Sequence, residues 1–224
     1  MPNDGKDRNI KAYQERKATM SMMTWRRLLV GIAAAVLLTA CATTKPSSFY
    51  LLSPIGNPSA EKPGTEGANA IALAIGPVKL PKHINRDQMV TYASPNKIKL
   101  AEFDRWGEPL ADNFARVLGD NLALLVPTQR IVVYPWRSGT PFEYQVIIEV
   151  SSFAVRPTGQ ALLVARWSIF SSKGKSVVMS WRSSFTQKVS SKGFEASAAA
   201  LSKLVAELSR DIATTVKTLP RISR

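Results

Sequence analysis

The chain offers few side chains that could do covalent or metal chemistry. Its 224 residues contain one cysteine, Cys41, and one histidine, His83. One thiol cannot form an internal disulfide, and one cysteine with one histidine cannot build a zinc cluster. His83 lies in the polar stretch PKHINRDQ, where a lone histidine is more often a surface residue than a ligand or a base.

Motifs for nucleophilic or nucleotide chemistry are missing from the sequence. It contains no G-x-S-x-G elbow, no G-x-x-x-x-G-K-[ST] loop and no G-x-G-x-x-G turn. Four acidic residues close together leave open a carboxylate pair for glycoside chemistry, although charge around a helix start is the commoner cause. They are Glu102, Asp104, Glu108 and Asp112. The sequence therefore gives no positive support for an enzyme.

The surroundings of the cysteine indicate an export signal. Leu28 to Leu38 form an uninterrupted apolar run, about half the ~20 residues that a membrane-spanning helix needs. Arg26 and Arg27 precede this run, and the small residues Thr39 and Ala40 follow it. A positive region, a short apolar region and a small-residue exit describe a secretory signal. The alternative, a buried core helix, lacks a polar face and a capping residue.

The exit of this signal resembles the bacterial lipobox, which reads Leu, a small residue, Ala or Gly, then Cys. Here the four residues are LTAC, ending at Cys41. The resemblance implies a cut between Ala40 and Cys41, a diacylglycerol thioether on the thiol and an N-acyl chain on the new amino group. Two or three acyl chains give stable anchoring, where one chain would not. No other cofactor is expected.

Localisation follows from the residue after the cysteine, which is Ala42. In lipoproteins of the enteric type, Asp at this position tends to retain the protein at the inner membrane. Its absence implies an outer-membrane lipoprotein of a Gram-negative bacterium, with its domain facing the periplasm.

The sequence predicts three parts. They are a signal peptide over 1–40, a lipidated tether over 41–48 and a single domain over 49–220. The methionines at 20, 22 and 23 are candidate initiators, so that residues 1–19 would be an over-extended start.

Periodicity places strands and helices along the domain. Strands are expected at 49–52, 71–78, 87–93, 97–103, 130–136, 142–153, 161–170 and 176–189. One helix is expected between Asp104, as a capping residue, and Pro127; a second runs over about 194–218 with an apolar stripe. That stripe packs on a sheet, or alternatively binds a partner. Alternation in the last three strands favours antiparallel pairing. We expect a mixed, largely antiparallel sheet with at least two packed helices in one α/β domain.

The net charge of +14 suits an anionic neighbour such as lipid headgroups, nucleic acid or an acidic polymer. Residues 1–40 carry seven basic and three acidic residues, which leaves 23 basic and 13 acidic residues, or +10, in the remainder. The basic residues are spread out and form no run of five. A solvated basic surface is therefore expected, and no nucleic-acid partner.

The order of segments after the lipobox resembles the ABC-type transport auxiliary lipoprotein family, which includes paraquat-inducible protein C. FYLL comes first, followed by LAIGPVKLPKHINRDQMVTY. The most specific part is FDRWGEPLADNFARVLGDNL, with its Trp-x-Glu-Pro-Leu helix opening. The three alternating strands and the amphipathic helix complete the likeness, which covers nearly all of residues 41–220.

The resemblance implies a fold, a role and partners. Members resemble three-layer α/β domains of the anticodon-binding type. They serve ABC systems in which an MCE-type substrate-binding protein moves lipids between the inner and outer membranes. The implied role is non-catalytic docking of that periplasmic MCE protein. The resemblance does not decide whether the chain forms a homo-oligomer. The alternative is an envelope-assembly or cell-wall-contacting lipoprotein. The family supplies no binding residues to carry over. Arg86, Arg105 and Trp106 are the exposed candidates for partner binding, and the alternative for each is a structural role, for Trp106 most of all.

Overall fold

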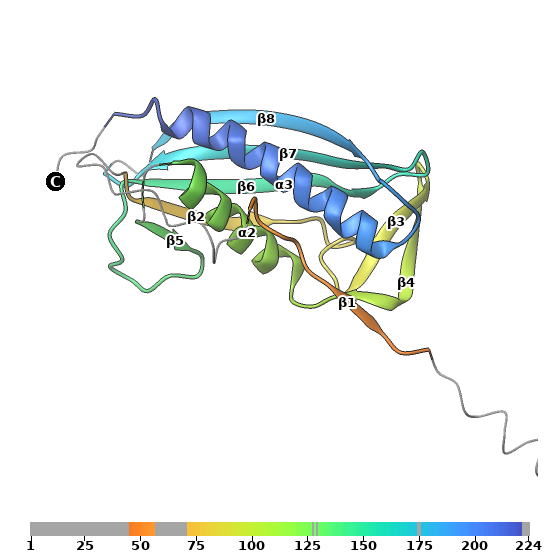
Figure 1. The fold of residues 1–224 in the computed structure, drawn as a ribbon. Coiled ribbons are helices and arrows are strands. Elements are labelled where there is room, and N and C mark those ends of the chain that lie inside the picture. Colours follow the sequence, from red (N-terminus) through yellow and green to blue (C-terminus); the bar gives the residue numbers. More distant parts are fainter. Residues whose placement is uncertain (1–44, 57–70, 127, 129, 174–175, 221–224) are drawn as a thin grey trace, which may run out of the picture. The chain divides into compact units, whose positions relative to one another are not determined.

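The structure, a computed structural model, describes residues 45–56, 71–126, 128, 130–173 and 176–220 (Figure 1). The chain divides into residues 1–46 and a compact unit over 47–224. The second unit holds every strand and helix named below. Ala40 and Cys41 lie outside the described residues, so signal cleavage and lipidation stay predictions. No helix in the described part of the chain is long and apolar enough to cross a membrane.

The described chain forms the eight strands and two helices that the periodicity predicts, with boundaries shifted by a few residues. They are β1 (Ser48–Tyr50), β2 (Leu73–Lys79), β3 (Gln88–Ser94), β4 (Lys97–Trp106), α2 (Leu110–Leu125), β5 (Ile131–Val133), β6 (Tyr144–Val155), β7 (Gln160–Ser171), β8 (Val177–Lys188) and α3 (Phe194–Val216).

All eight strands join one sheet with β6 at its centre. One edge of β6 pairs antiparallel with β7, and β7 pairs antiparallel with β8. The other edge pairs parallel with β2 and, at Val155, with β3. Beyond these, β5 extends β2, while β4 and then β1 extend β3. The predicted β3–β4 hairpin and the three long antiparallel strands are confirmed; the parallel pairings were not predicted.

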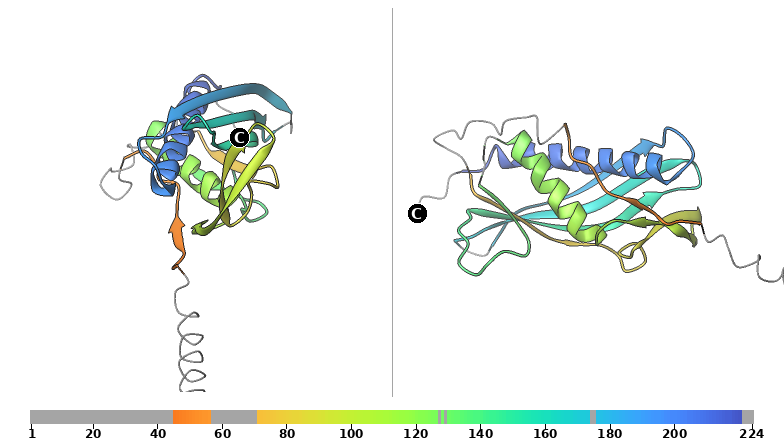
Figure 2. Two further views of the ribbon diagram at one scale, coloured as in Figure 1. Left: turned by 90° about the vertical axis from the view of Figure 1, so that its right-hand side faces the viewer. Right: turned by 60° about the horizontal axis from the view of Figure 1, so that its bottom comes forward.

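Both helices pack on the dry face of the sheet, where apolar side chains from alternate strand positions gather (Figures 1 and 2). Leu204 and Leu208 of α3 are almost fully buried, as are Phe114 and Leu118 of α2. The stripe of α3 is thus part of the core, and the alternative of a partner-binding face is wrong. Burying such side chains contributes about 1.5–3 kcal/mol each, which gives this unit a hydrophobic core of its own.

The mixed α/β class with two packed helices is confirmed. Because both helices share one face, a sheet layer and a helix layer account for the described residues. The third layer that the resemblance implied is not found among them. The capping role expected for Asp104 is wrong, since β4 continues to Trp106 and Asp104 pairs with β1 inside the sheet. Instead, α2 begins after Pro109 without a side-chain cap.

Candidate functional site

The chain enters the unit through a segment that both helices fasten, residues 48–55, which we call the N-terminal strap. After β1 the strap leaves the sheet and crosses the helix layer (Figure 1). Three of its backbone N–H groups donate to side-chain oxygens of the helices. The pairs are Leu52 with Asn113 Oδ1 (2.7 Å), Ser53 with Ser202 Oγ (3.0 Å) and Ile55 with Asn121 Oδ1 (2.7 Å). These side chains satisfy backbone groups that have no strand partner.

Asn121 connects the strap to both helices. Its side chain is fully buried, and its Nδ2 donates to Ser209 Oγ of α3 at 3.0 Å. Asn113 is equally buried and donates to Glu108 Oε1. Sequence reasoning did not assign these roles. The available signal was two asparagines within the apolar face of α2, because polar side chains are rarely buried without partners.

Apolar side chains are exposed where the chain enters the unit. Phe49 is 66% and Leu51 is 50% exposed. Between them, Tyr50 turns inward and its Oη donates to Asp104 Oδ1 at 2.9 Å, a hydrogen bond that raises the pKa of Tyr50. The entry point therefore presents two apolar side chains to its surroundings.

The three partner-binding candidates differ in exposure. Trp106 is 6% exposed and belongs to the core, so its expected exposure is wrong. It sits at the end of β4, where its backbone N–H donates to Asp87 O at 2.7 Å. Arg105 is half-buried, and its Nε is buried without a hydrogen-bond partner among the described residues. Arg86 is exposed. The structure does not present the three as one exposed site.

His83 and the four acidic residues also have ordinary structural surroundings. His83 is exposed, and its Nε2 lies 3.1 Å from Tyr92 Oη. Glu108 accepts from Arg116 and Asn113, while Asp104 holds Tyr50. The described residues hold no group of three or more His, Cys, Asp or Glu side chains that could bind a metal ion.

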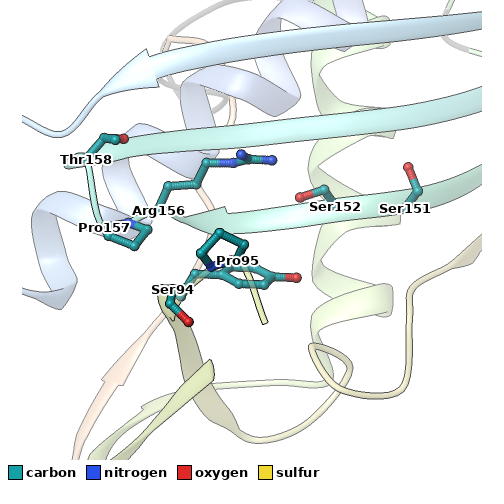
Figure 3. Close-up of a pocket in the computed structure, with 8 residues that line it drawn as sticks. Ser94, Pro95, Ser151, Ser152, Arg156, Pro157 and Thr158 are labelled. Atoms are coloured by element: carbon teal, nitrogen blue, oxygen red, sulfur yellow. The ribbon is translucent and has the colours of Figure 1, made fainter. Parts of the chain in front are cut away.

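A pocket of about 580 Å³ lies between the β3–β4 turn and the β6–β7 turn (Figure 3). Its lining comprises Tyr92, Ser94, Pro95, Ser151, Ser152, Arg156, Pro157 and Thr158. Figure 3 shows the side chain of Arg156 reaching along β6 in the direction of Ser152. Proline rings, a phenol ring, hydroxyls and one guanidinium thus share one hollow. Sequence reasoning missed this pocket, because the two turns meet only in the folded sheet.

A second hollow, of about 270 Å³, lies between β8 and the end of α3. In it Trp167 Nε1 donates to Ser183 Oγ at 3.0 Å, and Ser183 Oγ donates to Asp211 Oδ2 at 2.8 Å. A serine beside a carboxylate suggests hydrolytic chemistry only if a histidine lies between them. The single histidine of the sequence, His83, is not among its lining residues. We therefore interpret this chain of hydrogen bonds as a link between the sheet and α3.

Solved structures share this fold at low sequence identity. One, described as an uncharacterized protein, has a TM-score of 0.61 at 18% identity and covers 77% of this chain and 99% of its own. A Xanthomonas campestris protein of the family model DUF330 has a TM-score of 0.58 at 15% identity, covering 78% and 94%. PelC from Paraburkholderia phytofirmans, described as a dodecamer, reaches 0.43 at 10% identity, covering 80% and 100%, too distant to support any inference.

Sequence comparison identifies the family. No curated protein matches the chain. A family model, by contrast, matches residues 50–213, which include the strap after its second residue, the whole sheet from β2 onward and most of α3. The matched region exceeds half of the sequence and confirms the resemblance that the motifs suggested. The chain belongs to the family of ABC-type transport auxiliary lipoprotein components.

Proposed function

We propose that this protein is an outer-membrane lipoprotein that acts without catalysis as the auxiliary component of an MCE-type ABC system for lipid transport. Its domain faces the periplasm, and it docks the MCE-domain substrate-binding protein. Family membership supports the transport role, and the LTAC motif supports an anchor on Cys41. A homo-oligomer is compatible with the proposal.

The observation that carries the anchoring half is the strap. Only residues 42–47 separate the expected lipidated Cys41 from β1 at Ser48. Six residues span at most roughly 20 Å when fully extended. From Ser48 onward, three hydrogen bonds fasten the chain to the helices. The exposed Phe49 and Leu51 suit a surface held beside a membrane.

Partner identity is tested by detergent extraction and affinity capture of the tagged, lipidated protein from its host. The expected result is recovery of an MCE-domain protein together with the permease and ATPase. A capture that contains cell-wall or assembly proteins and none of these subunits would favour the envelope-assembly alternative and contradict the transport role. Arg86→Glu provides a directed variant, because Arg86 is the one of the three candidates that the structure exposes. Reduced recovery of the MCE-domain protein with unchanged membrane attachment is expected.

Anchoring is tested separately with Cys41→Ala. We expect an unprocessed precursor and no labelling by a fatty-acid probe, because the thiol is the acylated group. Ala42→Asp is the matched variant for sorting: it should still be labelled, but move from the outer-membrane to the inner-membrane fraction in an enteric host. A labelled Cys41→Ala protein would refute the anchor, and unchanged fractionation of Ala42→Asp would remove the argument for outer-membrane sorting.

A further inference from the structure

The pocket between the β3–β4 and β6–β7 turns combines a free cation with free hydroxyls. Among the described residues, the guanidinium of Arg156 forms no ion pair, and no hydrogen bond holds the hydroxyls of Ser94, Ser152 or Thr158. A guanidinium beside hydroxyls is the arrangement that binds phosphate oxygens through charge-assisted hydrogen bonds. The rings of Pro95 and Pro157 line the same pocket. They favour a ligand that carries an apolar portion next to its charged group.

The end of the sheet around this pocket is basic. Lys97 follows the β3–β4 turn, and Lys188 pairs with Gln160 immediately after the β6–β7 turn. Lys188 and Lys192 precede α3, whose first turn contributes the acidic Glu195. With Arg156 these side chains give four positive charges against one negative charge, or +3, and all five are exposed. Such a concentration of one sign attracts an anionic surface.

The direction in which β1 runs indicates how the end of the unit that holds the pocket lies relative to the expected anchor. β1 runs parallel to β4, with Ser48 beside Asp104. β4 starts at Lys97, next to the β3–β4 turn, so β1 runs in the direction that leads away from that turn. Its first residue lies beside a position seven residues along β4 from Lys97, roughly 23 Å by strand geometry. In Figure 1 the start of β1 and the β3–β4 hairpin both lie at the right-hand side.

We propose that this pocket binds the phosphate-bearing headgroup of a phospholipid in the membrane to which the chain is tethered. Arg156 and the hydroxyl of Ser152, toward which the guanidinium extends in Figure 3, hold the phosphate. The surrounding lysines attract the anionic surface, and the two prolines and the ring of Tyr92 contact the glycerol and the first methylenes. The location at a membrane rests on the proposed function, whereas the chemistry of the pocket stands on the described residues alone.

The test is a titration of the mature chain without its anchor, residues 42–224, which retains the whole compact unit with its core. The probe is dihexanoylphosphatidylglycerol below its micelle concentration, and the readout is the backbone amide shifts in NMR. We expect saturable shifts confined to the two turns that line the pocket. Arg156→Gln should weaken binding about tenfold, which is the lower part of the range for hydrogen bonds to charged groups.

Arg137→Gln is the matched control, because Arg137 is also exposed and lies in the β5–β6 connection rather than beside the pocket. It should change the affinity less than twofold. Equal affinity of Arg156→Gln and the unmodified chain would overturn the proposal, as would equal weakening by Arg137→Gln. Displacement of the lipid by the same concentration of inorganic phosphate would assign the pocket to free phosphate instead. Displacement by a glutamate-rich peptide would assign it to an acidic protein segment.

This experiment uses neither Cys41 nor a partner protein. A failed titration therefore leaves the labelling and capture results untouched, and a failed capture leaves the pocket assignment untouched.

Discussion

Replacing Asn121 with alanine should release the strap and destabilise the unit. The side chain is fully buried, accepts from Ile55 N–H at 2.7 Å and donates to Ser209 Oγ at 3.0 Å. Losing two hydrogen bonds costs about 1 kcal/mol each, and leaving a partly buried N–H without a partner adds about 1 kcal/mol. The better helix propensity of alanine returns about 0.6 kcal/mol. The expected loss is therefore about 2–3 kcal/mol of unfolding free energy.

Thermal and urea unfolding followed by circular dichroism measure this loss. A domain of this size loses about 2–4 °C of Tm per kcal/mol, so the expected decrease is about 5–10 °C. Hydrogen exchange measures the local effect. In Asn121→Ala the amide of Ile55 should exchange faster than in the unmodified chain, while the amides of β6 and β7 change less, because only the strap depends on Asn121 Oδ1 as an acceptor.

Asn85→Ala is the control, because Asn85 is exposed in the connection before β3. An exposed site of this kind should change stability by less than about 0.5 kcal/mol. If Asn121→Ala unfolds at the same temperature as Asn85→Ala, or if Ile55 keeps its protection, the strap is not held by Asn121 and the reasoning is refuted.

Two further predictions concern α2. In Gly119→Ala a Cβ would lie 2.8 Å from Val133 Cγ2 of β5, a clash that costs about 1–3 kcal/mol, while the better helix propensity of alanine returns about 1 kcal/mol. The expected net loss in urea unfolding is up to about 2 kcal/mol, and a stability gain of about 1 kcal/mol would show that β5 moves away without cost. Burial raises the pKa of Asp120, and the nearby Arg116 only partly opposes this. A raised carboxyl pKa means that stability is lost as pH rises through the folded-state pKa. Asp120→Asn should therefore unfold at a higher urea concentration than the unmodified chain at neutral pH. The difference between the two urea midpoints should shrink in acid, as the carboxyl becomes protonated. A difference that does not depend on pH would contradict this assignment.

The sequence predicts this fold well where periodicity decides the structure. β6, β7 and β8 alternate apolar and polar residues, so their existence and their dry face follow from the pattern. Strand partners are a different matter, because period-2 alternation does not say which strand lies beside which. The parallel neighbours of β2, namely β5 and β6, therefore emerged only from the structure.

The candidate site was less predictable than the fold for the same reason. Ser94 and Arg156 lie 62 positions apart, and no spacing rule brings two turns of different hairpins together. From the sequence, Trp106 is a candidate for partner binding with a structural role as its alternative, and the sequence pattern does not decide between them. Its place at the end of β4 buries it.

The short tether limits how the unit can lie if Cys41 carries the anchor. A compact unit of the 178 residues over 47–224 has a radius of gyration of about 16 Å. Its diameter is more than twice this radius and therefore exceeds the roughly 20 Å that residues 42–47 can span. The unit therefore cannot turn its far side toward the membrane without detaching the strap from α2 and α3. Since Asn113, Asn121 and Ser202 hold the strap in place, an anchor on Cys41 would keep the side by which the chain enters next to the lipid surface. The hydrogen bonds of the strap would then determine which side chains reach the headgroups, in addition to stabilising the fold.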